Sequence, residues 1–400
     1  WSSDVCSSDL KIYEKSNYRM YVHFNDSNYQ HLDYINHFDV NQRKIRRDLY
    51  DSRGFLSCSR TLTTNQKVVC EHYYTPEGTI KFQKFFNPEL ENSQSQLIIY
   101  NTDSQLKYFN NDQELLAFAI EKLYKNGDIF LSDKNINTAP IFNNTHVKNI
   151  DMVYESDIKN TYKHVFNNLN RYSGIIVSTK QQQLDISARI NNEIPVHTIP
   201  VGYIDEHFTN LKRNNHSINN NKIISVARYS PEKQLNHQIE LVSKLIKEFP
   251  NIQLHLYGFG KEEEKYKQLI TEYNLENNVF LRGFRRNLSA EIQDAYMSLI
   301  TSNMEGFNLG LLETITEGIP PVGYNSKYGP SELILNNENG YLINKNDKDE
   351  LYNRVRNLLL DKTLRDTFSQ ECIKHSKAFS SKIVMKLWED RFSTINSSYE

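Results

Sequence analysis

The chain has 400 residues, enough for two or three domains, and its 47 Lys and Arg residues nearly balance its 49 Asp and Glu residues. This balance gives no net field that favours nucleic acid or a membrane surface, and no apolar run approaches the roughly eighteen residues of a membrane-spanning helix. Four cysteines without a C-x-x-C pair, and no signal peptide, predict a cytoplasmic protein with at most a peripheral membrane association.

The amino-terminal quarter of the chain predicts strands. Residues 1–10 differ in composition from the remainder, so we expect them to be foreign to the fold or disordered. From residue 11 to 110, turn residues separate segments rich in aromatic and β-branched residues, and no helical period interrupts them. These segments are 18–24, 54–61, 67–74 and 80–86. We expect an inserted, mainly antiparallel β-sheet module.

Helices and strands alternate in residues 111–210, which is typical of βαβ units around a parallel sheet. The pattern predicts strands at 128–131, 140–143, 174–178 and 196–199, and helices at 114–124, 157–169 and 181–190. This series lacks a first strand with a glycine loop, so we expect the remainder of a Rossmann-like domain that is truncated at its N-terminus. The polar segment LKRNNHSINNNK then marks a domain boundary.

A second alternating series covers residues 221–380 and predicts a complete nucleotide-binding type of domain. IISVAR is its first strand, and Ser230 followed by Pro231 predicts the start of the next helix. The strands IQLHLYG, VFLRGF and IPPVGY follow, with a further helix predicted at 290–297. Two closing helices are expected after NGYLI, and the last of them forms a closing segment at 381–400.

The stretch 302–318, SNMEGFNLGLLETITEG, organises this domain. It follows a buried strand at 297–301, bends at Gly306 and continues as a helix with one apolar face. A strand, a turn and a helix start form an anion site, because free N–H groups and the helix dipole point at the turn. Glu305 on the turn and Glu313, expected about two turns into the helix, bracket that site. Carboxylates hold phosphate poorly but accept hydrogen bonds from sugar hydroxyls, so a sugar nucleotide fits, although the spacing also arises by chance.

Three further motifs follow predicted strands of the same domain, at the edge where open α/β sheets bind ligands. Arg228 and Lys233 flank a helix start and could face one diphosphate, or could be solvated surface charges. Gly258 and Gly260 of YGFG leave room for a ligand to approach the backbone. The third motif could flank a base or be an ordinary strand end; it consists of Arg282, Gly283 and Phe284.

In combination, these motifs resemble the retaining glycosyltransferases of the GT-B architecture, in the large family four. The resemblance covers about 112–392 and rests on Arg228 with Lys233, YGFG, EGFNLGLLE, and KYGPSEL followed by ENGYLI. YYTPEG and FFNP in the sheet module narrow it to the bacterial teichoic-acid α-glycosyltransferases. The O-glycosyltransferases that modify serine-rich adhesins are similar and share the insertion.

The resemblance implies a role for each motif. Arg228 and Lys233 would neutralise the donor diphosphate and the departing UDP, Glu305 would hold donor-sugar hydroxyls, and Glu313 would hold the ribose. His146 stands where the family places a histidine near the reacting carbon, although a lone histidine is more often structural. Backbone N–H groups would contact phosphate and sugar, and they belong to Gly306, Phe307 and Asn308.

The resemblance also implies an activity, the transfer of glucose or N-acetylglucosamine from a UDP-sugar to a hydroxyl of polyol-phosphate wall teichoic acid. Retention without a placed nucleophile implies that the acceptor attacks from the face that the phosphate leaves. No carboxylate–histidine set indicates a divalent cation, so we expect neither a metal nor another cofactor. Because the first strand is lacking, we expect this chain to bind nucleotide yet to turn over poorly or not at all.

Two other functions remain open at this point. One is O-glycosylation of serine-rich adhesin proteins, and the other is a non-catalytic glycosyltransferase-like subunit that binds acceptor. The presence of Arg228, Lys233, Glu305 and Glu313 together favours an enzyme. The sheet module has one apolar face to cover, and the resembling enzymes self-associate through it, so we expect a homo-oligomer.

Overall fold

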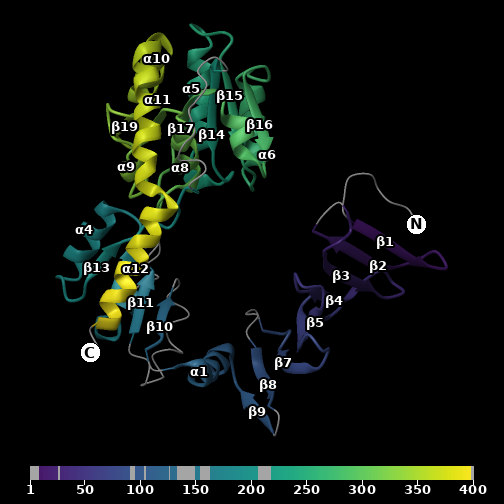
Figure 1. Ribbon diagram of the computed structural model, residues 1–400. Helices are drawn as coiled ribbons and strands as arrows, with labels where there is room; N and C mark the ends of the chain where they lie inside the picture. Colours follow the sequence, from purple (N-terminus) through teal and green to yellow (C-terminus); the bar gives the residue numbers. More distant parts are fainter. Residues whose placement is uncertain are drawn as a thin grey trace. The chain divides into compact units, whose positions relative to one another are not determined.

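The computed structural model describes residues 9–25, 28–90, 95–102, 105–125, 127–132, 149–153, 163–205 and 218–397. The chain divides into two compact units (Figure 1). One unit comprises Trp1–Asn126 and Asn137–Val147, and the other comprises Gly127–Ile136 and Lys148–Glu400. No helix among the described residues is both long and apolar enough to cross a membrane.

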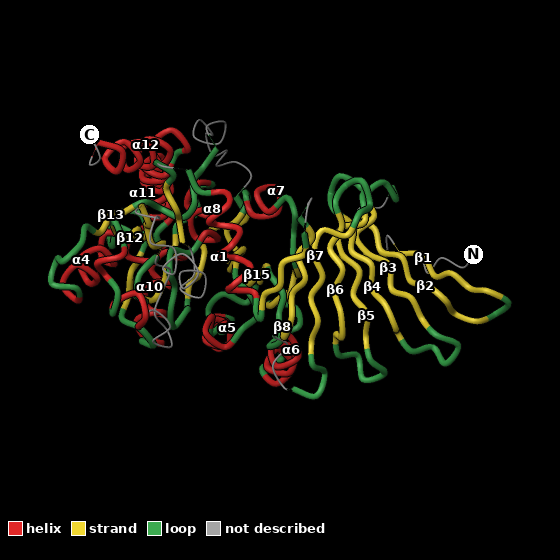
Figure 2. Tube along the Cα trace, turned by 90° about the horizontal axis from the view of Figure 1, so that it is seen from below, coloured by secondary structure: helices red, strands yellow, loops and turns green. Residues whose placement is uncertain are grey.

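The first unit is a nine-stranded antiparallel sheet in which every strand pairs with its neighbour in sequence. Figure 2 shows these strands side by side in a single layer. The strands are β1 (Asp9–Glu14), β2 (Asn17–Phe24), β3 (Leu32–Phe38), β4 (Lys44–Tyr50), β5 (Leu56–Leu62), β6 (Val68–Tyr74), β7 (Ile80–Phe86), β8 (Ser95–Asn101) and β9 (Leu106–Phe109). Helix α1 (Asp112–Leu123) follows them and packs against β8 and β9.

The sequence analysis identified β2 and β5 to β7 but missed β1, β8 and β9, and also β3 and β4. These last two strands carry several charged residues, whose side chains pair across the sheet instead of forming an apolar face. Asp48 on β4 is 4% exposed, and it accepts hydrogen bonds from Arg46 (2.6 Å) and from Ser59 on β5 (2.6 Å). His37 Nε2 on β3 lies 2.8 Å from the same carboxylate. Hydrogen bonds from such partners allow a carboxylate to be buried. A strand that buries polar residues in this way shows no regular spacing of apolar residues, so its sequence does not indicate a strand.

The second unit contains two parallel sheets. The smaller has the order β10 (Ile129–Ser132), β11 (Asn149–Val153), β12 (Gly174–Val177) and β13 (Val196–Thr198). Among the described residues that connect these strands are α3 (Lys163–Phe166), the 3-10 turn Leu169–Arg171, and α4 (Lys180–Arg189). The predicted strand at 140–143 and the first part of the helix predicted at 157–169 lie outside the described residues. β11 was missed.

The larger sheet has six parallel strands in the order β16-β15-β14-β17-β18-β19. Its strands are β14 (Asn219–Val226), β15 (Gln253–Tyr257), β16 (Val279–Gly283), β17 (Ala295–Ile300), β18 (Pro321–Tyr324) and β19 (Tyr341–Ile343). The strand order therefore reverses between β14 and β17, and ligands of open α/β sheets bind beyond the carboxyl ends of the strands at such a point. The fold thus predicts a ligand site at the loops after β14 and β17.

Helices surround this sheet and bury its central strands. They are α5 (Leu235–Leu245), α6 (Glu263–Glu272), α7 (Leu288–Ile292), α8 (Leu309–Thr316), α9 (Pro330–Leu333), α10 (Lys348–Leu360) and α11 (Lys362–Ser376), with 3-10 turns at Pro231–Lys233 and Lys377–Phe379. The last helix, α12 (Ser381–Ser397), follows them. Figure 1 shows α12 returning to the smaller sheet, where Val384 packs with Ile176 and Ile199.

Three predictions for the larger sheet and the helices after it were wrong. The helix expected at 290–297 ends at Ile292, and β17 begins at Ala295, because a short apolar run such as AYMSLI fits a buried strand as well as a helix. The helix expected from Pro231 is a 3-10 turn, and α5 starts only after Gln234, whose φ is 48°. Three closing helices, not two, follow β19.

Candidate functional site

The structure brings Lys233 and Glu305 together at the switch point of the larger sheet. Lys233 follows β14, Glu305 follows β17, and these two strands are neighbours. The Lys233 Nζ atom lies 2.7 Å from Glu305 Oε1, with the two side chains 13% and 8% exposed. A buried ion pair at this edge places one cation and one hydrogen-bond acceptor beside any ligand that enters it.

The Glu305 carboxylate is held by three donors at a single oxygen. Besides Lys233, the Ser302 hydroxyl donates to Oε1 at 2.6 Å and the Asn308 amide donates to it at 3.1 Å. The second oxygen, Oε2, receives no hydrogen bond from the described residues. The network therefore fixes the orientation of Glu305 and leaves one oxygen to accept a ligand hydroxyl.

The turn after Glu305 leads into α8 through Asn308. The predicted bend at Gly306 is present, but the residue with positive φ is Asn308 (78°), one of the few types that tolerate this region. Its side-chain oxygen caps α8 by accepting from Leu311 N–H at 2.9 Å. Among the described residues, nothing accepts a hydrogen bond from the N–H groups of Gly306, Phe307 or Asn308. The helix dipole points at the same turn, so these N–H groups have the arrangement from which an anion site was predicted.

Glu313 lies one turn into α8, not two, because the helix begins at Leu309. The buried Leu311, Leu312 and Ile315 anchor α8, as the apolar period predicted, whereas Leu309 of the same period is 50% exposed. Glu313 points away from them and forms no side-chain hydrogen bond with the described residues. Its side chain is exposed to the cavity, and partial desolvation by the surrounding protein atoms raises the pKa of Glu313.

A cavity of about 590 Å³ contains Glu313. Its walls come from residues 201–205, which follow the smaller sheet, from residues 286–289, which lead from the loop after β16 into α7, and from α8 itself. A Cβ at Gly202 would lie 2.2 Å from Leu309 Cδ2, so the loop at 201–205 packs directly on the start of α8. Both α/β halves of this unit therefore contribute to one cavity.

Two parts of this cavity were missed by the sequence analysis. Arg286 is exposed on the cavity wall and has no charged or hydrogen-bonding partner among the described residues. Its position just after β16 was a usable signal, because cations at carboxyl ends of strands are candidate ligand contacts. The loop at 201–205 carried no such signal, since only the tertiary fold brings it to α8.

Arg228 stands apart from the Lys233–Glu305 pair. Its side chain is 75% exposed and lies 3.2 Å from Glu232 Oε1. Glu232 also accepts from the Ser230 hydroxyl at 2.6 Å. Arg228 therefore occupies the predicted loop but is turned toward an acidic neighbour, so it must exchange that neighbour for a phosphate if it binds one.

The glycines of YGFG are required by the protein itself. Gly258 has a φ of 144°, and a Cβ there would lie 2.0 Å from the Ala227 carbonyl oxygen. Gly260 has a φ of 155°, and its Cβ would lie 2.4 Å from the Tyr229 carbonyl oxygen. The missing side chains thus allow the turn to pack against the loop after β14, and contact with a ligand is not needed to explain them.

In the motif formed by Arg282, Gly283 and Phe284, the two side chains have different surroundings. Arg282 donates to His255 at 3.0 Å and lies over the Phe280 ring, so the structure favours the ordinary strand-end interpretation for this residue. Phe284, after Gly283, is 64% exposed and forms an edge-to-face pair with Phe259 of YGFG at 6.3 Å. This aromatic pair lies at the carboxyl ends of β15 and β16.

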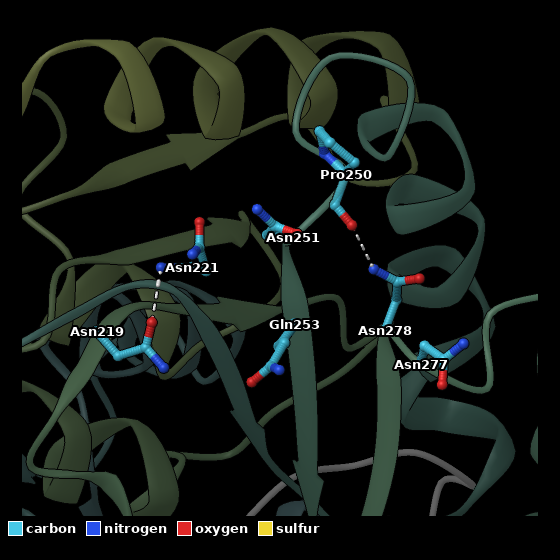
Figure 3. A pocket seen from close by; sticks show the side chains of 7 residues that line it. All are labelled: Asn219, Asn221, Pro250, Asn251, Gln253, Asn277 and Asn278. Atoms are coloured by element: carbon cyan, nitrogen blue, oxygen red, sulfur yellow. Dashed lines mark hydrogen bonds between the residues drawn. The ribbon is translucent and has the colours of Figure 1, made fainter.

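A second concave region lies at the opposite, amino ends of β14 and β15 (Figure 3). Amide side chains line its roughly 270 Å³, and some bond to nearby backbone, as Asn278 does to the Pro250 carbonyl at 3.1 Å. It is remote from the switch-point edge. His146 lies outside the described residues, and among those described no cluster of three or more His, Cys, Asp or Glu residues could hold a metal ion.

Residues 208–375, which carry the ion pair, α8 and the motifs above, match the family model of glycosyl transferases group 1. This segment is a group 1 glycosyltransferase domain. The chain is also 26% identical to the poly(glycerol-phosphate) alpha-glucosyltransferase of Bacillus subtilis strain 168, over 95% of this chain and 58% of that protein. It is 25% identical to the poly(ribitol-phosphate) alpha-N-acetylglucosaminyltransferase of Staphylococcus aureus strain COL, over 89% of this chain and 68% of that protein.

The fold is shared with a solved glycosyltransferase. The pneumococcal O-GlcNAc transferase GtfA, solved in complex with UDP and GlcNAc, superposes with a TM-score of 0.83 at 20% identity, over 98% of this chain and 80% of that one. The predicted GT-B fold with an additional antiparallel sheet is confirmed. The chain spans 58% of the length of the Bacillus enzyme.

Proposed function

We propose that the chain is part of a retaining glycosyltransferase that moves glucose or N-acetylglucosamine from a UDP-sugar to a hydroxyl of polyol-phosphate wall teichoic acid. The observation that carries this proposal is the buried Lys233–Glu305 pair at the N-terminal end of α8, beside the cavity that contains Glu313. A UDP-sugar has a matching sequence of groups: a diphosphate for the cation and helix end, a sugar for Glu305, and a ribose for Glu313.

The geometry supports a mechanism based on leaving-group stabilisation. Negative charge grows on the β-phosphate as the glycosidic bond breaks, and Lys233, Arg228 and the free N–H groups of α8 would stabilise that charge. Glu305 would hold the sugar through Oε2 while Oε1 keeps Lys233 in place. The acceptor hydroxyl would then attack the anomeric carbon of the sugar from the face that UDP leaves, and its proton would pass to the departing phosphate. These residues would supply the stabilisation without a metal, so we expect turnover to persist in EDTA.

The acceptor is the part of the proposal that similarity supports best. The Bacillus and Staphylococcus relatives are named for poly(glycerol-phosphate) and poly(ribitol-phosphate), which are polyanionic polymers. The likeness to the O-GlcNAc transferase GtfA supports a serine-rich protein acceptor as the second candidate. A non-catalytic subunit remains the third, because the ion pair could hold donor without transfer. A cytoplasmic location, where UDP-sugars are available, forms part of the proposal.

Release of UDP tests this function directly. The purified chain would be mixed with UDP-glucose or UDP-N-acetylglucosamine and with poly(glycerol-phosphate), poly(ribitol-phosphate) or a serine-rich peptide, each with and without EDTA. We expect one polymer to stimulate UDP release above the rate of hydrolysis, with the same rate in EDTA. Stimulation by the peptide alone would favour the second acceptor. Release that required Mn²⁺ would contradict the mechanism.

Replacement of Glu313 should affect stability and UDP binding in opposite directions. The raised pKa means that the folded protein binds the proton more tightly than the unfolded chain, so the ionised carboxylate lowers the free energy of unfolding as pH rises above its ordinary value. Glu313→Gln should therefore raise the melting temperature at neutral pH, with a gain that shrinks as pH falls toward 4.5. Glu313→Ala should weaken UDP binding by about 1–3 kcal/mol, because ribose hydroxyls lose their acceptor.

Calorimetry with UDP and thermal unfolding between pH 4.5 and 8 would measure both effects. Glu338→Gln, at an exposed turn after α9, serves as the control and should change neither quantity. UDP affinity that survives Glu313→Ala would remove this residue from the proposed site.

We also propose that the nine-stranded sheet mediates self-association. A single layer has two faces and two edges, and an exposed edge strand can pair with another chain. We expect sedimentation to show more than one chain per particle, and we expect Tyr13→Lys with Ile12→Lys on edge strand β1 to yield monomers that still bind UDP. Monomers of the unmodified chain at micromolar concentration would contradict this proposal.

A further inference from the structure

Helix α4, beside the smaller sheet, is bonded to the segment after β18 of the larger sheet. The Lys327 Nζ atom donates to Asp185 Oδ2 at 2.6 Å, and Asp185 lies on α4. Glu332 on α9 accepts from the backbone N–H of Lys180, at the first turn of α4, at 2.8 Å. A carboxylate at this end of a helix is favoured by the helix dipole. Two charge-assisted hydrogen bonds therefore join the two α/β halves.

In the Lys327–Asp185 pair, each residue stabilises the charged form of the other. The hydrogen bond from Lys327 lowers the pKa of Asp185, and the same bond raises the pKa of Lys327. Asp185 is 27% exposed and Lys327 is 69% exposed, so solvent screens the pair in part. The pair therefore contributes little to the overall stability of the protein. Its importance lies in the segments that it connects.

The same segment also holds the backbone of Glu305. Glu305 N–H donates to the Lys327 carbonyl at 3.0 Å, and the Glu305 carbonyl accepts from Tyr328 and, at 3.2 Å, from Gly329. A Cβ at Gly329 would lie 1.9 Å from the Phe307 carbonyl oxygen, so this segment presses against the turn into α8. Lys327 thus holds α4 with its side chain and Glu305 with its backbone.

We propose that Lys327, Asp185 and Glu332 are positioning residues that set the Glu305 carboxylate when the two α/β halves dock. This inference rests on the proposed function, because it concerns the sugar that Glu305 would hold. We expect the contacts of α4 to affect the binding of the donor sugar but not the binding of the nucleotide. In the described part of the chain, no hydrogen bond or ion pair joins Glu313 to the 327–329 segment, so we expect the binding of UDP alone to be insensitive to the contact.

The test compares the affinities for UDP and for UDP-sugar in the same variants by calorimetry without acceptor. UDP-glucose and UDP-N-acetylglucosamine would both be titrated, and the tighter one used. Asp185→Asn should weaken UDP-sugar binding roughly two- to fivefold and leave UDP binding unchanged. Adding Glu332→Gln should enlarge the loss to about tenfold. Glu240→Gln, which breaks the 2.5 Å pair with Lys348 away from Glu305, is the control and should change neither affinity.

A double-mutant cycle separates positioning from general damage. In a Glu305→Gln background, Asp185→Asn should cause no further loss of UDP-sugar affinity, because the carboxylate that it positions is gone. The exchange Asp185→Lys with Lys327→Asp should restore the preference for UDP-sugar. An unchanged UDP-sugar to UDP ratio in Asp185→Asn, or full additivity with Glu305→Gln, would overturn this inference while leaving the proposed function intact. An unmodified chain that binds neither ligand would overturn both.

Discussion

Lys233→Ala should slow sugar transfer by about 10²–10³ in kcat, with a smaller loss of donor affinity. Lys233 is the cation that the structure places at the switch point, 2.7 Å from Glu305, and charge on the departing phosphate is greatest in the transition state. Arg228→Ala should act in the same direction, because its exposed guanidinium can leave Glu232 for the diphosphate. UDP release in the presence of the stimulating polymer would measure the effect.

A matched control exists for this prediction. Lys348→Ala removes a lysine of the same domain that bonds Glu240 at 2.5 Å, and it should leave kcat unchanged. If both Lys233→Ala and Arg228→Ala retained the turnover of the unmodified chain, the diphosphate would have to bind elsewhere.

Glu305→Gln should abolish most transfer while it preserves the affinity for UDP. The substitution keeps the shape of the side chain, so the hydrogen bond from Ser302 can persist, but it removes the charge that binds Lys233 and weakens the acceptor for sugar hydroxyls. We expect kcat to fall by at least about 10², because orientation of the sugar and placement of the lysine are lost together. UDP contains no sugar at this position, so its dissociation constant should change less than about twofold.

The pair should also behave as a unit. Lys233→Ala leaves the Glu305 carboxylate, 8% exposed, without its counter-charge, and a buried unpaired charge is destabilising by about 3–5 kcal/mol at most sites. Lys233→Ala combined with Glu305→Gln should therefore be more stable than Lys233→Ala alone. Thermal unfolding of the three variants would show this order, and additive losses of stability would argue against a coupled pair.

The sequence predicted the larger sheet well because its strands and helices have clear apolar periods. It placed Lys233 after one strand and Glu305 after another, and the reversal of strand order at β14 and β17 made them neighbours. It did not predict the hydrogen bonds of Ser302 and Asn308 to Glu305, since side-chain orientation in a turn leaves no periodic signal. Contacts between the two halves, such as Lys327 with Asp185, were equally invisible.

The glycines of YGFG and the charged residues of β3 and β4 gave the least reliable indications of structure. Gly258 and Gly260 indicated close approach to the backbone, and the structure shows that the approaching atoms are carbonyl oxygens of the protein. The charged strands β3 and β4 gave no strand signal, because residues such as Asp48 are buried through hydrogen bonds and not through apolar packing. Both errors have the same origin, namely that one residue type serves several physical roles which only the tertiary contacts distinguish.

Titration of the purified chain with UDP by calorimetry tests the central claim most directly, because the claim is that the cavity beside α8 binds the donor nucleotide. We predict saturable binding of one UDP per chain, weakened by Glu313→Ala and unaffected by Glu338→Gln or by EDTA. Binding that was insensitive to Glu313→Ala, or a chain that bound no UDP, would contradict the account.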